Sequence, residues 1–331
     1  MSDGPRQTYT ELQVTTNFTF LRGASHPQEM VEQAAAYGYK EIAITDRNTF
    51  AGIVRAHVAA KAKGIRIIPG CRLDLLDGPS LLVYPININA YSQLCTLLTI
   101  GNRRAEKGDC HLYKEDVYQH CKEVKLILLP PGTLNEVFEF DVSFREALLE
   151  YKNVFGKDLY IAATRRYVGD DSKYLYQLTQ ISDELQVPLV ATNDVHYHEP
   201  ARRQLQDIVT CVREKCTIYN AGFHLHPNAE RFLKPNNEML RLFRQYPGAI
   251  LNTQQIVEAC RFSLDELKYE YPEEITTGGR NPLQELEFRV WEGAWQFYGH
   301  SVPEKISTAI HYELDFIERM NYASYFLTVY D

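Results

Sequence analysis

Up to Pro200, short apolar runs alternate with longer stretches in which apolar residues recur at helical spacing. The apolar runs predict strands at residues 41–45, 65–68, 73–76, 80–84, 124–129, 158–163 and 188–192. The longer stretches predict helices at residues 28–37, 54–62, 91–100, 144–155 and 173–185. Alternation of this kind is typical of βα units on a parallel sheet, and a series this long favours a barrel over an open sheet.

The segment Glu11–Pro27 predicts a strand, a loop and the start of a helix. Leu12 and Val14 alternate with polar neighbours, Gly23 breaks the run, and Ser25 stands three residues before Gln28, at the spacing of a capping box. Loops at the carboxyl ends of strands are where α/β folds hold their functional groups. The loop after this strand is therefore the first place to look for a site.

Beyond Pro200 the pattern becomes mainly helical, with helices predicted at residues 202–212, 237–245, 253–260, 282–296 and 303–320. Residues 276–279 form a glycine-containing linker in this interpretation. The final run, residues 322–331, is apolar, and a chain that stopped inside it would leave an unpaired segment exposed. We therefore expect the sequence to be part of a longer protein.

Composition narrows the classes of function. The net charge of −8 is a poor match to a domain that grips a long stretch of nucleic acid by itself, although the polar loop expected at residues 101–108 carries a few basic side chains. Seven cysteines without a Cys-x-x-Cys pair favour reduced thiols in the cytoplasm. No apolar segment reaches the ~18 residues of a membrane span, and the polar N-terminus argues against a signal peptide.

The opening segment resembles the first motif of the PHP domain, the polymerase-and-histidinol-phosphatase module of bacterial C-family DNA polymerases, which include the DNA polymerase III alpha subunit. The family pattern is Glu-Leu-His-x-His-Ser-x-Phe-Ser-x-Leu-Asp-Gly-Ala-Ser, and this chain has ELQVTTNFTFLRGAS over Glu11–Ser25. The sequence of this segment is most similar to that of the error-prone, damage-tolerant branch of these polymerases. Two later segments also resemble the family: Phe262–Pro272 is similar to the exit from the PHP domain, and Tyr322–Asp331 resembles the first strand of the polymerase palm.

The resemblance implies a distorted, seven-stranded TIM-like barrel over residues 1–270, including its helical C-terminal part. Residues 271–331 would then hold a linker, helices and the first palm strand.

The resemblance also implies a degenerate metal site. In the family, histidines and carboxylates at strand ends hold up to three divalent ions. Here the matching positions and their neighbours are Gln13, Thr15, Arg22, Asp46, Arg47, Arg72, Asp194 and His196. Only Asp194 and His196 match family ligands clearly, so they are the residual candidates for a metal.

Arginine at these positions argues against a bound metal, because its guanidinium stays charged and cannot coordinate a cation. We therefore expect no metal in this chain. Our hypothesis is that Arg22, Arg47 or Arg72 pairs with Asp46, Asp74 or Asp194, which replaces metal–carboxylate bonds by ion pairs. The rival hypothesis is a remnant anion site in which the arginines bind a phosphate or nucleotide.

The resemblance therefore implies that this chain is part of an error-prone DNA polymerase and that its PHP domain has a structural role. The intact enzyme would transfer nucleotides from dNTPs on a DNA template, with Mg²⁺ held by palm carboxylates downstream of Asp331. No cofactor and no catalytic residue are expected in this chain itself. A sliding clamp and translesion accessory proteins are expected partners, and no membrane is. The alternatives are a metal-dependent PHP phosphoesterase or 3′–5′ proofreading exonuclease, and a phosphate-binding or nucleotide-binding module.

Overall fold

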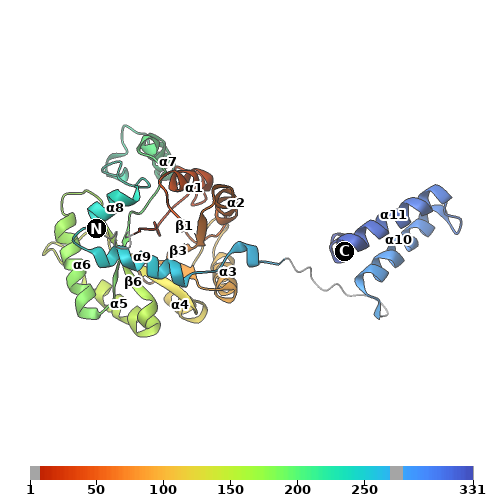
Figure 1. Ribbon diagram of the computed structural model, residues 1–331, viewed down its shortest axis with the longest axis horizontal. Helices are drawn as coiled ribbons and strands as arrows, with labels where there is room; N and C mark the ends of the chain where they lie inside the picture. The colour runs from red at the N-terminus through yellow and green to blue at the C-terminus, as the bar shows by residue number, and fades with distance from the viewer. Residues whose placement is uncertain (1–7, 269–278, 331) are drawn as a thin grey trace, which may run out of the picture. The chain divides into compact units, whose positions relative to one another are not determined.

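The computed structural model describes residues 8–268 and 279–330, and the chain divides into two compact units at residue 267 (Figure 1). The predicted boundary at residue 270 and the linker residues 276–278 lie outside the described residues. None of the described helices is long and apolar enough to cross a membrane.

The strands of the first unit belong to two sheets. They are β1 (Glu41–Ile44), β2 (Arg66–Pro69), β3 (Cys71–Leu73), β4 (Leu81–Pro85), β5 (Val124–Leu128), β6 (Leu159–Thr164) and β7 (Leu189–Thr192). β1 pairs with β2 in parallel, and the second sheet has the order β3-β4-β5-β6-β7. β4 is antiparallel to both of its neighbours, whereas β5, β6 and β7 are parallel. β3 and the reversed β4 form a hairpin, and β3 lies slightly earlier in the chain than the strand predicted at residues 73–76.

Two further connections join the sheets into a closed barrel. The extended segment 11–15 lies between β7 and β1: the Thr15 N–H donates to the Val195 carbonyl (2.8 Å), and the Thr45 N–H donates to the Val14 carbonyl (2.8 Å). On the other side of β1, the N–H groups of Gly70 and Arg72 donate to the carbonyls of Ile44 and Asp46. β2 and β3 therefore act as one bent strand, and the predicted distorted barrel is confirmed.

Alternation along the strands separates two apolar layers. Inside the barrel lie residues such as Leu12, Ala43, Leu82 and Val190, all fully buried. Their sequence neighbours on the strands point outward into the larger core that the surrounding helices cover. Because both faces of the barrel strands are buried, each strand appears in the sequence as a continuous run of apolar residues.

Helices surround the strands in Figure 1, and α9 crosses one end of the barrel. They are α1 (Pro27–Ala36), α2 (Ile53–Lys63), α3 (Ile88–Arg104), α4 (Lys114–His120), α5 (Val142–Phe155), α6 (Asp171–Leu185), α7 (Arg203–Glu214), α8 (Asn236–Leu242) and α9 (Pro247–Ala259). Ile256 and Val257 of α9 pack against the interior layer, and Asn252 donates to the carbonyl of Leu189 at the start of β7 (2.7 Å). α9 therefore closes the amino-terminal end of the strands and leaves the carboxyl-terminal end for a site.

Local details differ from the sequence predictions in three places. α3 continues to Arg104, so only the part of the predicted loop 101–108 that follows Arg104 is a loop. Glycine is required at position 101 inside the helix, because a Cβ there would lie 2.6 Å from the Leu112 side chain. α4 was not predicted. The cap of α1 is His26, whose N–H donates a hydrogen bond to the Glu29 carboxylate (2.8 Å), whereas the Ser25 hydroxyl is bonded to His198 instead.

The second unit contains α10 (Pro282–Tyr298), α11 (Glu304–Met320) and α12 (Ala323–Tyr330). The prediction of a palm strand at residues 322–331 is wrong for residues 323–330, which are helical. Ala323 and Leu327 are one helical turn apart and pack together against Leu286, Leu314 and Ile317. A helix places both on one face, and this packing outweighs the strand propensity of the aromatic residues between them.

Candidate functional site

Polar side chains gather at the carboxyl-terminal end of the barrel, where the loops after β1, β3, β6 and β7 meet. A cavity of about 230 Å³ opens there, and its lining includes Gln13, Arg47, Arg72, Asp194 and Arg231. Four of the predicted site residues therefore line one space. The other four, Thr15, Arg22, Asp46 and His196, lie around it without lining it.

Asp74 is held by two arginines. Its carboxylate accepts hydrogen bonds from Arg47 Nη1 (2.7 Å), Arg72 Nε (2.7 Å) and the Ser80 hydroxyl (2.6 Å). Burial would raise the pKa of Asp74, but the charges of Arg72 and Arg47 hold it below the usual value. Two of the hypothesised ion pairs are thus present, and Asp74 joins the loop after β1 to the hairpin.

Asp46 is buried and meets hydroxyl groups instead of arginines. It accepts hydrogen bonds from the N–H (2.8 Å) and hydroxyl (2.8 Å) of Thr16 and from the hydroxyl of Thr19 (2.6 Å). Burial raises its pKa, and these hydrogen bonds lower it only in part. Its role in the structure is to fix the opening loop above β1.

Asp194 is paired with Arg231, a residue that the sequence analysis did not single out. Arg231 Nη1 donates to one carboxylate oxygen and Gln13 Nε2 donates to the other (2.8 Å). Burial would raise the pKa of Asp194, but the charge of Arg231 holds it well below its usual value. Nothing near Arg231 in the sequence marks it, because the contact joins residues 37 positions apart.

His196 is a buried, hydrogen-bonded residue. Its Nδ1 lies 3.2 Å from the carbonyl of Arg22, which can only accept, so Nδ1 carries the proton. Nε2 is then free to accept from Arg231 Nη1 (3.2 Å). Burial lowers the pKa of His196, which keeps the ring neutral in this arrangement.

Arg22 and Thr15 contribute mainly through the backbone. The carbonyl of Arg22 also accepts from Gln206 Nε2 (2.7 Å), and its half-buried guanidinium lines a neighbouring cavity of about 640 Å³ together with Arg47 and Asp74. Burial lowers the pKa of Arg22. Thr15 is buried in the strand segment that closes the barrel.

The arrangement of ligand atoms does not fit a divalent metal cluster. Asp74 and Asp194 are already neutralised by arginine, and Asp46 is engaged by the hydroxyl groups of Thr16 and Thr19. Among the described residues no three His, Cys, Asp or Glu side chains come close enough to share an ion. Arginines occupy the positions beside the carboxylates where cations would lie. The site can bind or orient an anion, and it holds its loops together through ion pairs.

The sequence of the barrel matches a known domain family. Residues 11–166 match the family model described as "PHP domain", and residues 284–331 match "Bacterial DNA polymerase III alpha NTPase domain". Among solved structures, an amidohydrolase from Chromobacterium violaceum aligns with a TM-score of 0.43 and 14% identity over 57% of this chain and 87% of that one.

The chain is similar to error-prone DNA polymerases along nearly its whole length. It is 44% identical over 324 residues to the error-prone DNA polymerase of Caulobacter vibrioides, which covers 98% of this chain and 29% of that protein. It is also 44% identical over 322 residues to error-prone DNA polymerase 2 of Agrobacterium fabrum, covering 97% of this chain and 29% of that protein. The resemblance to the error-prone branch is confirmed, and the chain spans under a third of the length of these relatives.

Proposed function

We propose that this chain is the PHP-domain part of an error-prone DNA polymerase, in which the barrel is metal-free and structural. The observation that carries the proposal is the pairing of Asp74 with Arg47 and Arg72, and of Asp194 with Arg231. These ion pairs neutralise Asp194, a residual candidate for a metal ligand, and the neighbouring Asp74. They also join loops from separate strands, which suits a rigid support for the rest of the enzyme.

The proposal includes an activity for the whole protein, which is inferred from its relatives. It is template-directed transfer of nucleotides from dNTPs to DNA during damage-tolerant synthesis, with Mg²⁺ bound by palm carboxylates outside this chain. A sliding clamp and translesion accessory proteins are the proposed partners. A cytoplasmic location is proposed with it, supported by the seven cysteines, which are free thiols.

Metal content tests the proposal directly. The purified chain is analysed for zinc, manganese and iron, and is assayed for phosphoesterase and 3′–5′ exonuclease activity with added manganese or zinc. We expect neither stoichiometric metal nor activity, and no difference between the natural chain and Asp194→Ala. Stoichiometric metal and hydrolysis that Asp194→Ala abolishes would overturn the proposal and make the barrel a working PHP hydrolase.

A second candidate function is anion binding in the cavity between Arg47, Arg72, Arg166 and Arg231. The observation that favours it is charge: these four arginines line the space together with a single carboxylate, Asp194. Arg166 lies over the ring of Tyr174, with Cζ 5.5 Å from its centroid, and is engaged in no ion pair with a described carboxylate. Binding of phosphate that Arg166→Gln weakens would support this function.

A further inference from the structure

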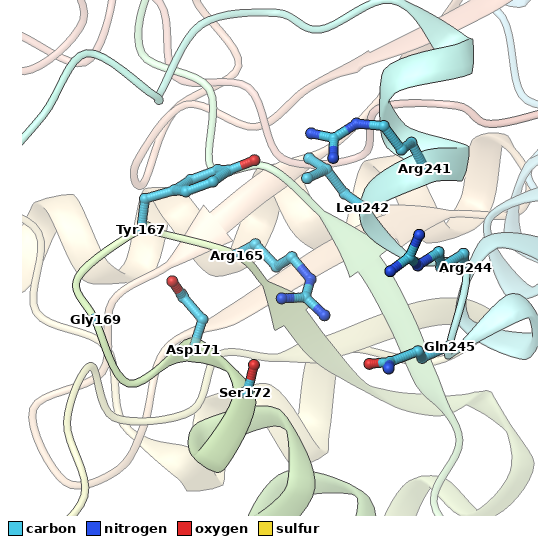
Figure 2. Close-up of a pocket in the computed structure, with 9 residues that line it drawn as sticks. All are labelled: Arg165, Tyr167, Gly169, Asp171, Ser172, Arg241, Leu242, Arg244 and Gln245. Atoms are coloured by element: carbon cyan, nitrogen blue, oxygen red, sulfur yellow. The ribbon is translucent and has the colours of Figure 1, made fainter.

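A second cavity, separate from the degenerate site, is also rich in arginine. It has a volume of about 600 Å³ and lies between the loop after β6, the start of α6 and the end of α8 (Figure 2). The polar side chains that line it include Arg165, Tyr167, Asp171, Ser172, Arg241 and Arg244. Neither the resemblance to polymerases nor the ion pairs described above account for it.

Arg165 and Arg166 stand side by side at the end of β6 but serve different cavities. Arg166 lines the degenerate site, and Arg165 lines the second cavity. The alternation of side chains along an extended strand explains the division. One residue step therefore separates two cationic spaces, which makes the two arginines a matched pair for experiment.

Two of the three arginines in the second cavity have no ion-pair partner among the residues that the structure describes. Within the described part of the chain, neither Arg165 nor Arg244 forms an ion pair, and Arg165 Nε is buried without a hydrogen-bond acceptor. Arg241 differs, because its guanidinium is engaged by Glu238 (2.7 and 2.8 Å). In Figure 2 the guanidinium groups of Arg165 and Arg244 face the same space from opposite walls.

The start of α6 brings free N–H donors to the wall of this cavity. Asp171 and Ser172 form its first turn, and the cap residue Asp170 makes no side-chain hydrogen bond to the free N–H groups there. Asp171 is the one carboxylate in the lining, and it accepts the N–H of Arg166 (2.7 Å). A buried donor without an acceptor is costly, so an anion in this space would supply what the chain does not.

We propose that this second cavity binds a phosphate group, held between the guanidinium groups of Arg165 and Arg244, with the Ser172 hydroxyl as a further donor. Guanidinium groups match the oxygens of phosphate in geometry and charge. The space exceeds the size of one phosphate, so the group can belong to a free phosphorylated molecule or to a nucleic-acid strand. The chemistry of recognition is the same for both sources.

The first experiment is a titration of the full chain with inorganic phosphate, in which phosphorus NMR measures the binding. The variants are Arg165→Gln, Arg244→Gln and the double variant, with Arg166→Gln reporting on the degenerate site. Arg145→Gln is the matched control, because Arg145 on α5 forms an exposed ion pair with Glu184 on α6. We expect each single change in the second cavity to weaken binding about tenfold, as the loss of a charged hydrogen bond does, and the control to bind as the natural chain does.

Unchanged affinity in the double variant, or an equal loss in Arg166→Gln, would overturn the proposal. Thermal unfolding of every variant is measured alongside. If the double variant does not fold, Arg244→Gln alone decides the outcome, because Arg244 is exposed and its substitution leaves no cavity in the core.

A second titration, with an oligothymidylate that lacks a terminal phosphate, distinguishes the sources. If the strand is the ligand, the double variant reduces the magnitude of the slope of log affinity against log salt by about 0.7, the value for one lost phosphate contact on a single strand. If the variant weakens phosphate binding but leaves the strand unaffected, the ligand is a free phosphorylated molecule.

Discussion

At the scale of single residues, arginine side chains determine what the carboxyl-terminal end of the barrel can do. A guanidinium beside Asp74 or Asp194 satisfies the carboxylate as a metal would, but it fixes the loops in one arrangement and offers no open coordination position. Motif alignment predicted that Arg47 or Arg72 pairs with a carboxylate, with Asp74 as one of three candidates, and the structure selects Asp74 for both arginines. The part played by Arg231 could not be predicted, since only folding brings it to Asp194.

Glu11 shows how burial changes a single carboxyl group. It is fully buried and accepts hydrogen bonds from the Tyr9 hydroxyl (2.6 Å) and the N–H groups of Gln13 (2.9 Å) and Asn193 (3.1 Å). Burial raises its pKa to about 7, although these hydrogen bonds act to lower it. The carboxyl group ties the barrel-closing segment to the end of β7.

The pH dependence of stability follows from this raised pKa. The folded state holds a proton on Glu11 that the unfolded state releases near pH 4.5, so the stabilising contribution is complete below pH 4.5 and is lost as the pH rises to about 7. We expect a loss of about 3 kcal/mol in the free energy of unfolding over this range. Urea unfolding at several pH values measures it.

In Glu11→Gln this component of the pH profile should vanish. Glu184→Gln, a change at an exposed carboxyl group, should keep the profile of the natural chain. Parallel profiles for the natural chain and Glu11→Gln would contradict the assignment.

At the scale of elements, the opening loop depends on close backbone packing. A Cβ on Gly23 would lie 2.2 Å from the carbonyl oxygen of Thr16, closer than any real contact. The loop folds back on itself there, with the Asn17 N–H donating to the Ser25 carbonyl (2.9 Å) and the Ala24 N–H donating to the His196 carbonyl (2.9 Å). The glycine in the motif is therefore a packing requirement, independent of any metal.

Gly23→Ala should accordingly lower the free energy of unfolding by about 2–3 kcal/mol, because the backbone must shift to admit one methyl group. Gly248→Ala, in the first turn of α9, is the control: a Cβ there meets nothing within 4 Å, and the change should be neutral or slightly stabilising. Chemical denaturation of both variants measures the difference. Equal stability of the two would show that the loop adapts without cost.

At the scale of the whole molecule, each unit has its own apolar core. Two buried clusters lie within residues 9–260, and a third joins α10, α11 and α12 within residues 286–327. The bonds that close the barrel, from segment 11–15 to β1 and β7, also lie within the first unit. Each unit therefore has the packing that an independent fold requires.

Residues 1–267 should consequently fold without the second unit. We expect the truncated chain to unfold cooperatively, with a midpoint within about 3 °C of the corresponding transition of the full chain, a difference of about 1 kcal/mol or less. Circular dichroism during heating measures both. A truncated chain without a cooperative transition would show that the barrel needs residues 268–331.

The sequence by itself determined the order of strands and helices, the barrel and the loss of metal ligands, because these depend on local periodicity and on residue identity at motif positions. Only the tertiary structure decided the partners of the charged groups: Arg231 with Asp194, Glu11 with Asn193, and Arg165 facing a different cavity from Arg166. It also made residues 323–330 a helix. Burial and long-range contact energies control these features, and both arise only when distant segments of the chain pack together.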